Sequence, residues 1–588
     1  MAPTTTHIDT NNPEFQNALQ IVEYTRRSLF LTGKAGTGKS TFLRYICSTT
    51  KKKFVVLAPT GIAAINVGGA TLHSFFKIPF HPLLPNDVNY SEKNIRETLK
   101  YTGEKRKIIR EVELIIIDEI SMVRADIIDF VDKVLRIYTR NRYEPFGGKQ
   151  LLLVGDIYQL EPVVKEEDRQ LLQPFYPSAF FFDARVFRQM SLVSIELTKV
   201  YRQNDEQFIH ILDKIRTNTI SSAELSVLNQ HVGKQLAKNE SELSITLSTR
   251  RDTVDYINDQ HLQQLPGDVV TLKGTIDGEF PESSLPTTID LDVKVGAQVI
   301  FVKNDMEHRW VNGTLGTITG IDLDEEGNQL LMVRTDEGEE YDVDQAVWSN
   351  MRYTYNEQEE KIEEEEIGRF VQYPIRLAWA ITVHKSQGLT FQRVNIDLDG
   401  GAFAGGQTYV ALSRCSSLEG ISLKDPIRMS DIFVRSEVVR FARNYNNRNM
   451  IDSVLKESQA DKEYHDAVKA FDAGDMEFFL DNFFKAIHHR YDIERPEVRR
   501  LIRMKLNHLS GFRNECRRME EEQQRQKNLL KRLAAEYTLM GKECEREGMP
   551  DAAIANYKKA LSLYPEAPEP KRRLKKLEKN NPQTKSRG

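Results

Sequence analysis

The stretch from Leu31 to Thr41, LTGKAGTGKST, restricts what this chain can fold into more than any other part of the sequence. An apolar run precedes it and a helix-like FLRYI follows it, so its glycines, lysine and serine have the spacing and the setting of a phosphate-binding loop. Glycines let consecutive backbone N–H groups turn toward a phosphate, which a Cβ would obstruct. The sequence therefore predicts a nucleotide site that comprises Gly33, Lys34, Ala35, Gly36, Thr37, Gly38, Lys39, Ser40 and Thr41.

Two side chains of this loop are predicted to contact the nucleotide and its metal ion. Lys39 is expected to reach the β and γ phosphates of ATP, and Ser40 to offer its hydroxyl to Mg²⁺. The helix that begins there points the positive end of its dipole at the triphosphate. The predicted cofactors are therefore ATP and Mg²⁺.

Length and composition limit the number of domains and the classes of protein to which the chain can belong. A chain of 588 residues is too long for a single core and suggests roughly three to five domains. A net charge of -5 argues against a protein that coats nucleic acid by bulk charge, although it allows a local basic channel. Four scattered cysteines, an N-terminus without a basic start, and the lack of an apolar run of roughly 18 residues predict a soluble cytoplasmic protein without a membrane partner.

Two further apolar runs end in groups suited to nucleotide chemistry. ELIIIDEISM ends a buried strand with Asp118, expected to hold Mg²⁺, and Glu119, expected to orient and deprotonate the attacking water. KQLLLVGDIYQLEPV places Asp156 and Gln159 at the end of another strand. The sheet puts Gln159 beside the nucleotide, where it is expected to sense the γ phosphate.

The segment KKKFVVLAPTGIAAINVGGATLHSFF predicts a nucleic-acid track. Its run Phe54 to Ala58 is typical of a buried parallel strand, whose carboxyl end lies on the ligand side of the sheet. Small residues after the strand suit the approach of a sugar-phosphate backbone, and the aromatic rings beyond them could stack on a base, although as isolated features they would be core aromatics. The candidate DNA-binding residues here are Thr60, Gly61, Ala63, Ala64, His73, Ser74, Phe75 and Phe76.

Longer segments show a family resemblance. DEISM at Asp118 through PFGG at Pro145 to GDIYQLEPV at Gly155 is similar to the signature region of the petite-integration-frequency (PIF) family of superfamily 1 DNA helicases. The similarity continues through LTKVYRQNDEQFIHILDKIR, RLAWAITVHKSQGLTF and GQTYVALSRCSSLEGI, and covers Pro13 to about Arg443. One departure is Glu161, which stands where many relatives have a second proline; we expect no loss of chemistry from it.

The resemblance implies roles for further residues. Arg202 and Arg414 would point at the γ phosphate from a second RecA-like domain, and Gln16 would contact the adenine edge, unless it is an ordinary exposed helix residue. His384, Lys385, Ser386, Gln387 and Gly388 would contact the DNA backbone and relay the nucleotide state. The family also implies movement 5′ to 3′ on single-stranded DNA, and single-stranded and forked DNA as partners.

Between the halves of the second RecA-like domain, short alternating apolar runs separated by NG, EEGN and DEGE turns are typical of a small antiparallel barrel. In related helicases the insertion at this place is a Src-homology-3-like barrel. The acidic run from Glu357 to Glu366 is expected to be a solvated loop or helix end, with a device that repels misplaced DNA as the alternative.

The C-terminal region from about Asn447 changes to charged helices and contains a repeat. With Ala534 as the first position, a 34-residue unit fits the tetratricopeptide pattern, and an earlier copy from Ala460 is degenerate. Such helix pairs stack and leave a groove for a partner segment. Docking of a protein partner and packing on the helicase core are both open.

The predicted fold class is α/β, with two RecA-like P-loop domains, a small β-barrel insertion and an all-α tetratricopeptide-like region. The expected domains are 1–190, 191–290 with 371–445, the insertion 291–370, and the helical region 446–588. The expected function is an ATP-dependent DNA helicase in repair, recombination or replication. Two alternatives stay open: a single-strand translocase or RNA-directed NTPase, and a weak motor recruited to a partner by the C-terminal repeats.

Overall fold

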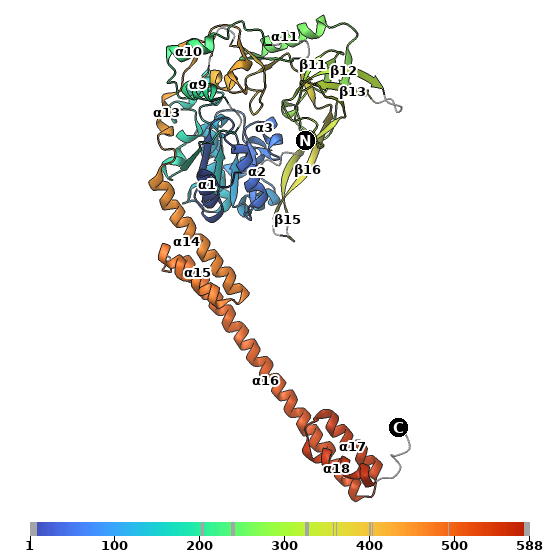
Figure 1. Ribbon diagram of the computed structural model, residues 1–588. Helices are drawn as coiled ribbons and strands as arrows, with labels where there is room; N and C mark the ends of the chain where they lie inside the picture. Colours follow the sequence, from blue (N-terminus) through green and yellow to red (C-terminus); the bar gives the residue numbers. More distant parts are fainter. Residues whose placement is uncertain are drawn as a thin grey trace. The chain divides into compact units, whose positions relative to one another are not determined.

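The computed structural model describes residues 9–201, 205–236, 242–323, 329–356, 358–359, 361–398, 401–402, 404–491, 493–494 and 496–580. These belong to two compact units, Met1–His489 and Arg490–Gly588, and each is described by itself. Figure 1 shows the elements of both units. Among the described residues no helix is long and apolar enough to cross a membrane.

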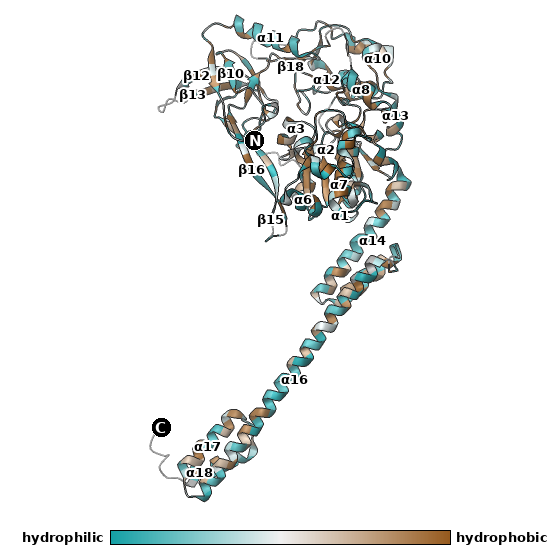
Figure 2. Ribbon diagram, turned by 180° about the vertical axis from the view of Figure 1, so that it is seen from behind, coloured by the Kyte–Doolittle hydropathy of each residue, from teal (hydrophilic) through white to brown (hydrophobic). Residues whose placement is uncertain are grey.

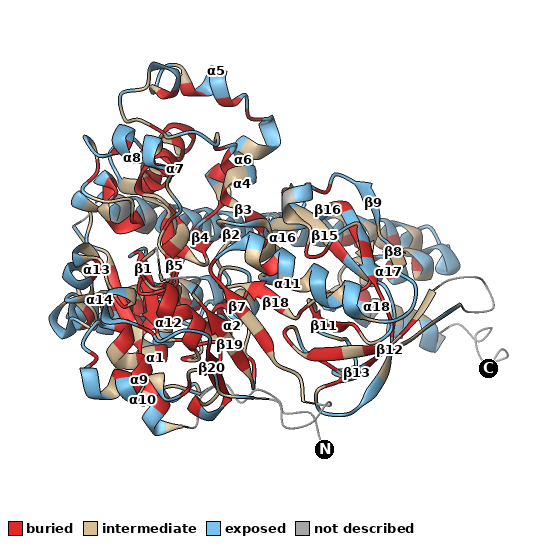
Figure 3. Ribbon diagram, turned by 90° about the horizontal axis from the view of Figure 1, so that it is seen from above, coloured by how far each residue is buried: buried red, intermediate tan, exposed pale blue. Residues whose placement is uncertain are grey.

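A six-stranded sheet with the order β3-β2-β4-β5-β1-β6 forms the centre of the first domain, and all its neighbouring pairs are parallel. Its central strands are continuous apolar runs buried on both faces, as a parallel sheet covered by helices requires, and Figure 3 shows them buried. The predicted strand at Phe54–Ala58 is confirmed. The strands are β1 (Leu29–Gly33), β2 (Phe54–Ala58), β3 (Ala70–Thr71), β4 (Leu114–Ile117), β5 (Gln150–Val154) and β6 (Val193–Leu197).

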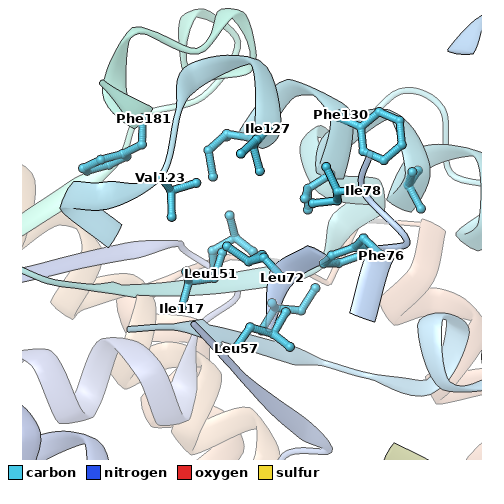
Figure 4. Packing of buried hydrophobic residues seen from close by; sticks show 14 of the residues in the cluster. Leu57, Leu72, Phe76, Ile78, Ile117, Val123, Ile127, Phe130, Leu151 and Phe181 are labelled. Atoms are coloured by element: carbon cyan, nitrogen blue, oxygen red, sulfur yellow. The ribbon is translucent and has the colours of Figure 1, made fainter. Parts of the chain in front are cut away.

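Helices cover both faces of this sheet because side chains alternate along each strand. Leu57, Ile117 and Leu151 lie on one face with Ile127 of α7, as Figure 4 shows, whereas Val56, Ile116 and Leu152 lie on the other with residues of α1 and α2. The helices of this domain are α1 (Pro13–Tyr24), α2 (Lys39–Thr49), α3 (Gly61–Asn66), α4 (Leu72–Phe76), α5 (Ile95–Leu99), α6 (Gly103–Glu111), α7 (Ala125–Thr139) and α8 (Glu166–Leu172).

A second parallel sheet, with the order β18-β7-β19-β20, has its own buried core. Two parallel sheets in one chain match the expected pair of RecA-like domains. The elements are β7 (Ile245–Ser248), β18 (Ala380–Thr382), β19 (Val394–Asp397), β20 (Ile421–Leu423), α9 (Glu206–Arg216), α10 (Ser222–Asn229), α11 (Arg251–Gln264) and α12 (Gln407–Leu412).

The insertion is antiparallel, as predicted. Five strands pair in the order β14-β13-β12-β11-β17, and closure of these strands into a barrel stays a prediction. Two smaller sheets, β10-β8 and β15-β16-β9, complete it, so the inserted strands begin before the expected boundary at residue 291 and end after the one at 370. The strands are β8 (Val270–Lys273), β9 (Thr275–Gly278), β10 (Asp290–Val293), β11 (Gln298–Phe301), β12 (Leu315–Leu323), β13 (Gln329–Thr335), β14 (Glu340–Val343), β15 (Ala346–Asn356), β16 (Lys361–Gln372) and β17 (Ile375–Leu377).

The acidic run differs from its prediction, since its described part beyond residue 360 lies in β16 of a long hairpin with β15. Cross-strand partners explain the difference. Arg352 lies opposite Glu365 and forms an ion pair with it at 2.8 Å, and Asn356 donates to Glu363 at 3.2 Å. Charges that look solvated in the sequence are thus paired along a strand.

After the second sheet the chain returns to the first domain through α13 (Ser436–Ala442) and α14 (Arg448–Ala473). Ile451 and Val454 of α14 are buried with α1, and Ser458 donates to the carbonyl of Gln20 at 3.0 Å. The far end of α14 pairs with α15 (Met476–His489). The part of α14 that precedes the earlier repeat at Ala460 therefore packs on the first domain, and partner docking by the C-terminal region stays a prediction.

The second unit is entirely helical where it is described, with α16 (Pro496–Arg546), α17 (Pro550–Leu563) and α18 (Pro568–Asn580). Figure 2 shows polar and apolar residues interspersed along α16. At the predicted repeat, a Cβ on Gly541 would lie 2.5 Å from the ring of Tyr557, which is fully buried. This close helix pair fits a tetratricopeptide unit, and the repeat assignment stays a prediction.

Candidate functional site

The phosphate-binding loop connects β1 to α2, as the sequence predicts. Gly36 and Gly38 have φ of 79° and 91°, a left-handed conformation in which a side chain would be strained. Thr37 is buried, and its hydroxyl donates to the carbonyl of Lys34 at 2.9 Å. Ser40 and Thr41 lie in the first turn of α2, with Ser40 exposed. The loop therefore presents backbone N–H groups and a hydroxyl at a helix N-terminus, which suits a phosphate and its metal ion.

Lys39 lies inside this loop. Its Nζ donates to the carbonyl oxygens of Gly33 at 2.6 Å and Lys34 at 3.0 Å. Burial lowers the pKa of Lys39, while the carboxylates of Asp156 and Glu119 oppose that shift. A buried ammonium group beside two acids is placed to compensate the charge of a phosphate.

The two acids after β4 stand next to one another at the end of the strand. Glu119 has φ 48° and ψ 42°, which is rare outside glycine, and its N–H donates to Oδ1 of Asp118 at 2.9 Å. Burial raises the pKa of Glu119 to about 7, and the Asp118 carboxylate adds to this rise. Burial also raises the pKa of Asp118. A strained acid with a pKa near neutrality is suited to act as a general base.

The described residues hold no cluster of three or more histidine, cysteine or acidic side chains that would bind a metal ion by itself. Mg²⁺ commonly takes one or two protein ligands and completes its shell with phosphate oxygens and water. Ser40 and Asp118 offer a hydroxyl and a carboxylate, which are oxygen donors of the kind that Mg²⁺ takes, and their binding of Mg²⁺ together with a nucleotide stays a prediction.

The turn after β5 is the third part of the site. Asp156 is buried, and its Oδ1 accepts from the N–H of Tyr158 at 3.1 Å. Gln159 lies at the end of this turn, where its Oε1 is 3.5 Å from Nε2 of Gln387 in the second domain. The structure thus brings the predicted Gln159 and Gln387 together.

Other second-domain groups reach the same place. The hydroxyl of Tyr409 accepts from the N–H of Ala35 in the phosphate-binding loop at 3.3 Å, and Lys34 pairs with Asp213 of α9. Arg216, also of α9, donates to Asp156 at 3.1 Å and to Glu196 at 2.9 Å. The site therefore lies between the two parallel sheets.

Of the two arginines that the resemblance assigns to the γ phosphate, the structure describes only Arg414. Arg202 lies outside the described residues. Arg414 is 1% exposed, and its guanidinium donates to the carbonyl oxygens of Val410 at 3.0 Å and Leu389 at 3.2 Å. Its charge acts against the rise in the pKa of Glu119. Contact with the γ phosphate stays a prediction.

Gln16 is exposed on α1. An exposed position agrees with an adenine contact and with an ordinary helix surface residue alike, so the adenine contact stays a prediction.

The first candidate DNA segment follows β2. Thr60 caps α3 by accepting from the N–H of Ala63 at 3.2 Å, and Ala64 is buried. Gly61 has no room for a side chain, since a Cβ would lie 2.1 Å from the hydroxyl of Ser284 in the insertion. Thr60, Gly61 and Ala63 are accessible at least in part, whereas the side chain of Ala64 points inward.

The stacking role predicted for Phe75 and Phe76 does not agree with their positions. Both rings are buried in the core of the first domain, at 2% and 0% exposure, because the five-residue helix α4 turns them inward. Lys105 lies over the Phe75 ring with its Nζ 3.2 Å from the centroid. Neither ring offers a face to a base in this conformation.

An exposed aromatic stack lies nearby that sequence reasoning missed. Phe80 is 89% exposed, and its ring stacks on His73 with centroids 5.1 Å apart and planes 7° from parallel. Ser74 is also exposed. The signal available in the sequence was the proline before Phe80, because a helix that contains Phe75 and Phe76 is expected to end before it.

The second candidate DNA segment, His384 to Gln387, divides by side-chain direction. Lys385 is exposed and His384 half-buried, and burial lowers the pKa of His384. Ser386 is fully buried and donates to the carbonyl of Val383 at 2.8 Å, so a DNA contact by its hydroxyl does not agree with this structure. Gln387 faces Gln159, as described above.

Comparisons with known proteins agree with this geometry. The model of the PIF1-like helicase family matches residues 14–226. The ATP-dependent DNA helicase PIF1 of Homo sapiens is 35% identical over 412 residues, which are 68% of this chain and 58% of that protein. The chain thus spans less than two thirds of the length of this curated relative.

Solved structures extend the comparison over the second sheet. Bacteroides sp Pif1 in complex with ADP-AlF4 is 39% identical, with a TM-score of 0.67, and the match covers 73% of this chain and 96% of that one. Bacteroides Pif1 bound to single-stranded DNA is also 39% identical, with a TM-score of 0.53 and 74% and 97% covered. The chain belongs to the PIF1-like helicase family.

Proposed function

We propose that this chain is an ATP-dependent DNA helicase that moves 5′ to 3′ along single-stranded DNA and separates duplex and forked DNA. The observation that carries the proposal is the contact of the second domain with the phosphate-binding loop of the first, through Tyr409 and Asp213. Hydrolysis at such an interface can be coupled to movement of one domain against the other. Membership of the family and the complexes of the Bacteroides relative with ADP-AlF4 and DNA support it.

The chain's residues take separate roles in this proposal. The loop amides, Lys39 and Thr37 bind the triphosphate, Ser40 and Asp118 hold Mg²⁺, and Glu119 takes a proton from the attacking water. When bound, Mg²⁺ neutralises charge on the β and γ phosphate oxygens. Gln159 reports the γ phosphate to Gln387, and Arg202 and Arg414 compensate charge on the transferred group as the cleft closes.

For the DNA strand we propose a track over Thr60, Gly61 and Ala63 of the first domain and His384 and Lys385 of the second. Phe80 with His73 is the stacking platform in place of the buried Phe75 and Phe76, since base stacking on an aromatic ring is worth about 1 to 3 kcal/mol per base. Contacts to the backbone predict little sequence preference and a steep loss of affinity with salt.

The test uses two duplexes that differ only in the end that carries a single-stranded overhang. We expect ATP-dependent strand displacement from the 5′ overhang and none from the 3′ overhang. Glu119→Gln is expected to bind ATP and DNA yet lose orders of magnitude in turnover, of the size seen when a transition-state interaction is removed. Displacement from the 3′ overhang alone would reject the proposed direction.

The same assay separates the alternatives. ATP hydrolysis stimulated by single-stranded DNA without strand displacement would indicate a translocase, and displacement confined to RNA strands would indicate an RNA-directed enzyme. The large apolar side chains exposed on α15, such as Phe478 at 52% and Phe484 at 64%, favour a protein partner for the C-terminal helices in addition. Capture of a partner by residues 450–588 would support that recruitment.

A further inference from the structure

We propose that Arg216 is a positioning residue that ties the Asp156–Gln159 turn of the first domain to α9 of the second, so that movement between the domains is transmitted to Gln159. This inference rests on the proposed motor function, and it assigns a role to an arginine that lies outside the phosphate-binding loop and the acidic pair. The evidence is the set of contacts that Arg216 makes across the two domains.

The backbone of Arg216 lies in a helix of the second domain, whereas its side chain contacts residues of the first domain. It is the last residue of α9, whose Phe208, Ile211 and Ile215 are buried in the core of the second sheet. Its guanidinium reaches Asp156 and Glu196, which follow or lie in strands β5 and β6 of the first sheet. The side chain is 4% exposed, so the bridge is shielded from water and salt.

The contacts fix both the position and the plane of the guanidinium. One terminal nitrogen donates to Glu196 at 2.9 Å, the other to Asp156 at 3.1 Å, and the group lies 4.4 Å from the centroid of the Tyr158 ring. Lysine cannot reproduce this arrangement, because its ammonium is a single point without a plane. The geometry selects arginine at this position.

The Asp156–Gln159 turn, which Arg216 contacts, is also restrained by its own hydrogen bonds and by close packing against the second domain. Asp156 accepts from the N–H of Tyr158, and the N–H of Gln159 donates to the Asp156 carbonyl at 2.9 Å. On another side Gly406, which caps α12 of the second domain, lies so close that a Cβ there would be 2.2 Å from the Gln159 carbonyl oxygen. The turn is thus held by α9 and by the start of α12, both from the second domain.

Charge explains why the bridge matters for nucleotide binding as well. Arg216 donates to the buried carboxylate of Asp156, whose charge also acts on Lys39 of the phosphate-binding loop. Without the Arg216 charge, Asp156 would be left as a buried carboxylate that attracts Lys39 with no arginine to compensate it. Lys39 would then pair more strongly with Asp156 and less readily with a phosphate.

The test compares Arg216→Lys with Arg309→Lys in the full chain. Arg309 also pairs with a carboxylate, at 2.9 Å from Asp305, and lies 4.6 Å from the Trp310 ring, but it belongs to the insertion. We expect Arg216→Lys to reduce the stimulation of ATP turnover by single-stranded DNA about 2- to 30-fold, the range of coupling effects along a physical network. The KM for ATP is expected to rise with it, and Arg309→Lys is expected to leave both unchanged.

Glu196→Gln provides a second route if Arg216→Lys does not fold. It removes one carboxylate from the bridge, and we place no nucleotide or DNA contact on this residue. We expect a smaller loss of DNA stimulation in the same direction, with the melting temperature measured in parallel. Loss of stability with unchanged stimulation and KM in a folded variant would overturn the inference, whereas an unmutated chain without any DNA stimulation would instead reject the proposed function.

Discussion

The hydroxyl of Tyr409 accepts a hydrogen bond from the backbone N–H of Ala35 at 3.3 Å, so a side chain of the second domain bonds directly to the phosphate-binding loop. Both residues are buried. An N–H group that donates to Tyr409 is not available to a phosphate oxygen at the same time. The relation between the two residues is therefore one of competition with the nucleotide.

Tyr409→Phe tests this competition. Removal of the hydroxyl frees the Ala35 N–H, and a typical net hydrogen-bond contribution of about 0.5 to 1.5 kcal/mol corresponds to roughly 2- to 10-fold tighter ATP binding. Titration of an ATP analogue measures it. Tyr143→Phe, at a side chain that is 95% exposed, is the control and should bind as the unmutated chain does. Weaker binding by Tyr409→Phe would show that the hydroxyl assists the nucleotide.

The acid at position 119 predicts a pH dependence. Its pKa is raised to about 7, and only the deprotonated form can accept a proton from water. The ratio kcat/KM for ATP reports the protein before the nucleotide binds, so it should fall about tenfold per pH unit below 7 and level off above it. A profile flat from pH 5.5 to about 8.5 would contradict the assignment of Glu119 as base. In Glu119→Gln the residual kcat/KM should not show this decline below pH 7.

The same pKa shift predicts an effect on stability with a defined sign. The folded state binds the proton of Glu119 more tightly than the unfolded state, where the carboxyl has its ordinary value of 4.5. This group therefore costs stability as pH rises from about 4.5 to 7, and Glu119→Gln should remove that cost. Urea unfolding at pH 5 and pH 8 measures it: the variant should gain more at pH 8, and an equal change at both values would contradict the shift.

The hydroxyl of Tyr353 links the hairpin of the insertion to strand β2 of the first sheet. Tyr353 accepts from the N–H of Val56 at 2.9 Å and donates to its carbonyl at 3.1 Å, satisfying a part of β2 that the short strand β3 does not reach. Tyr353→Phe leaves two buried backbone groups unpaired, at a cost of about 1 to 3 kcal/mol each. The urea midpoint should fall without a change in slope.

Tyr355→Phe is the matched control for Tyr353→Phe. Tyr355 lies two residues along the same strand and is only half-buried, and its hydroxyl accepts from Lys53 at 3.2 Å. Its loss should change stability by about 0.5 kcal/mol or less, as is usual near the surface. Equal effects of the two variants would show that the pairing with β2 is not what stabilises the hairpin.

Helix α16 contains two glycines, Gly541 and Gly511, of which only Gly541 packs closely against another helix. Gly541→Ala places a methyl group against the buried Tyr557 ring, whereas Gly511→Ala on the same helix meets nothing within 4 Å. Alanine is favoured over glycine in a helix by about 1 kcal/mol, so Gly511→Ala should stabilise α16 while Gly541→Ala loosens its contact with α17. Hydrogen exchange of residues 550–563 in the full chain should accelerate only in Gly541→Ala.

Much of this protein follows from local sequence. The phosphate-binding loop, the strand at Phe54–Ala58 and the acids Asp118 and Glu119 could be placed because glycine spacing and unbroken apolar runs act within a few residues. The antiparallel character of the insertion follows from its turns and alternation. The close contact of Gly541 with Tyr557 agrees with the repeat pattern in the same way.

What depended on partners distant in the chain could not be read from the sequence. Phe75 and Phe76 look like stacking residues until the burial of α4 turns them inward, and the hydroxyl of Ser386 is directed inward by the turn that contains it. Glu365 remains exposed, but it lies in a strand instead of the expected loop or helix end because β15 brings Arg352 beside it. The sequence places Arg216 only at the end of a family-like segment, and its role could not be predicted because it depends on Asp156 and Glu196 of another domain, 60 and 20 residues away in the chain. Such contacts are set by packing of the two sheets, and only the tertiary structure decides them.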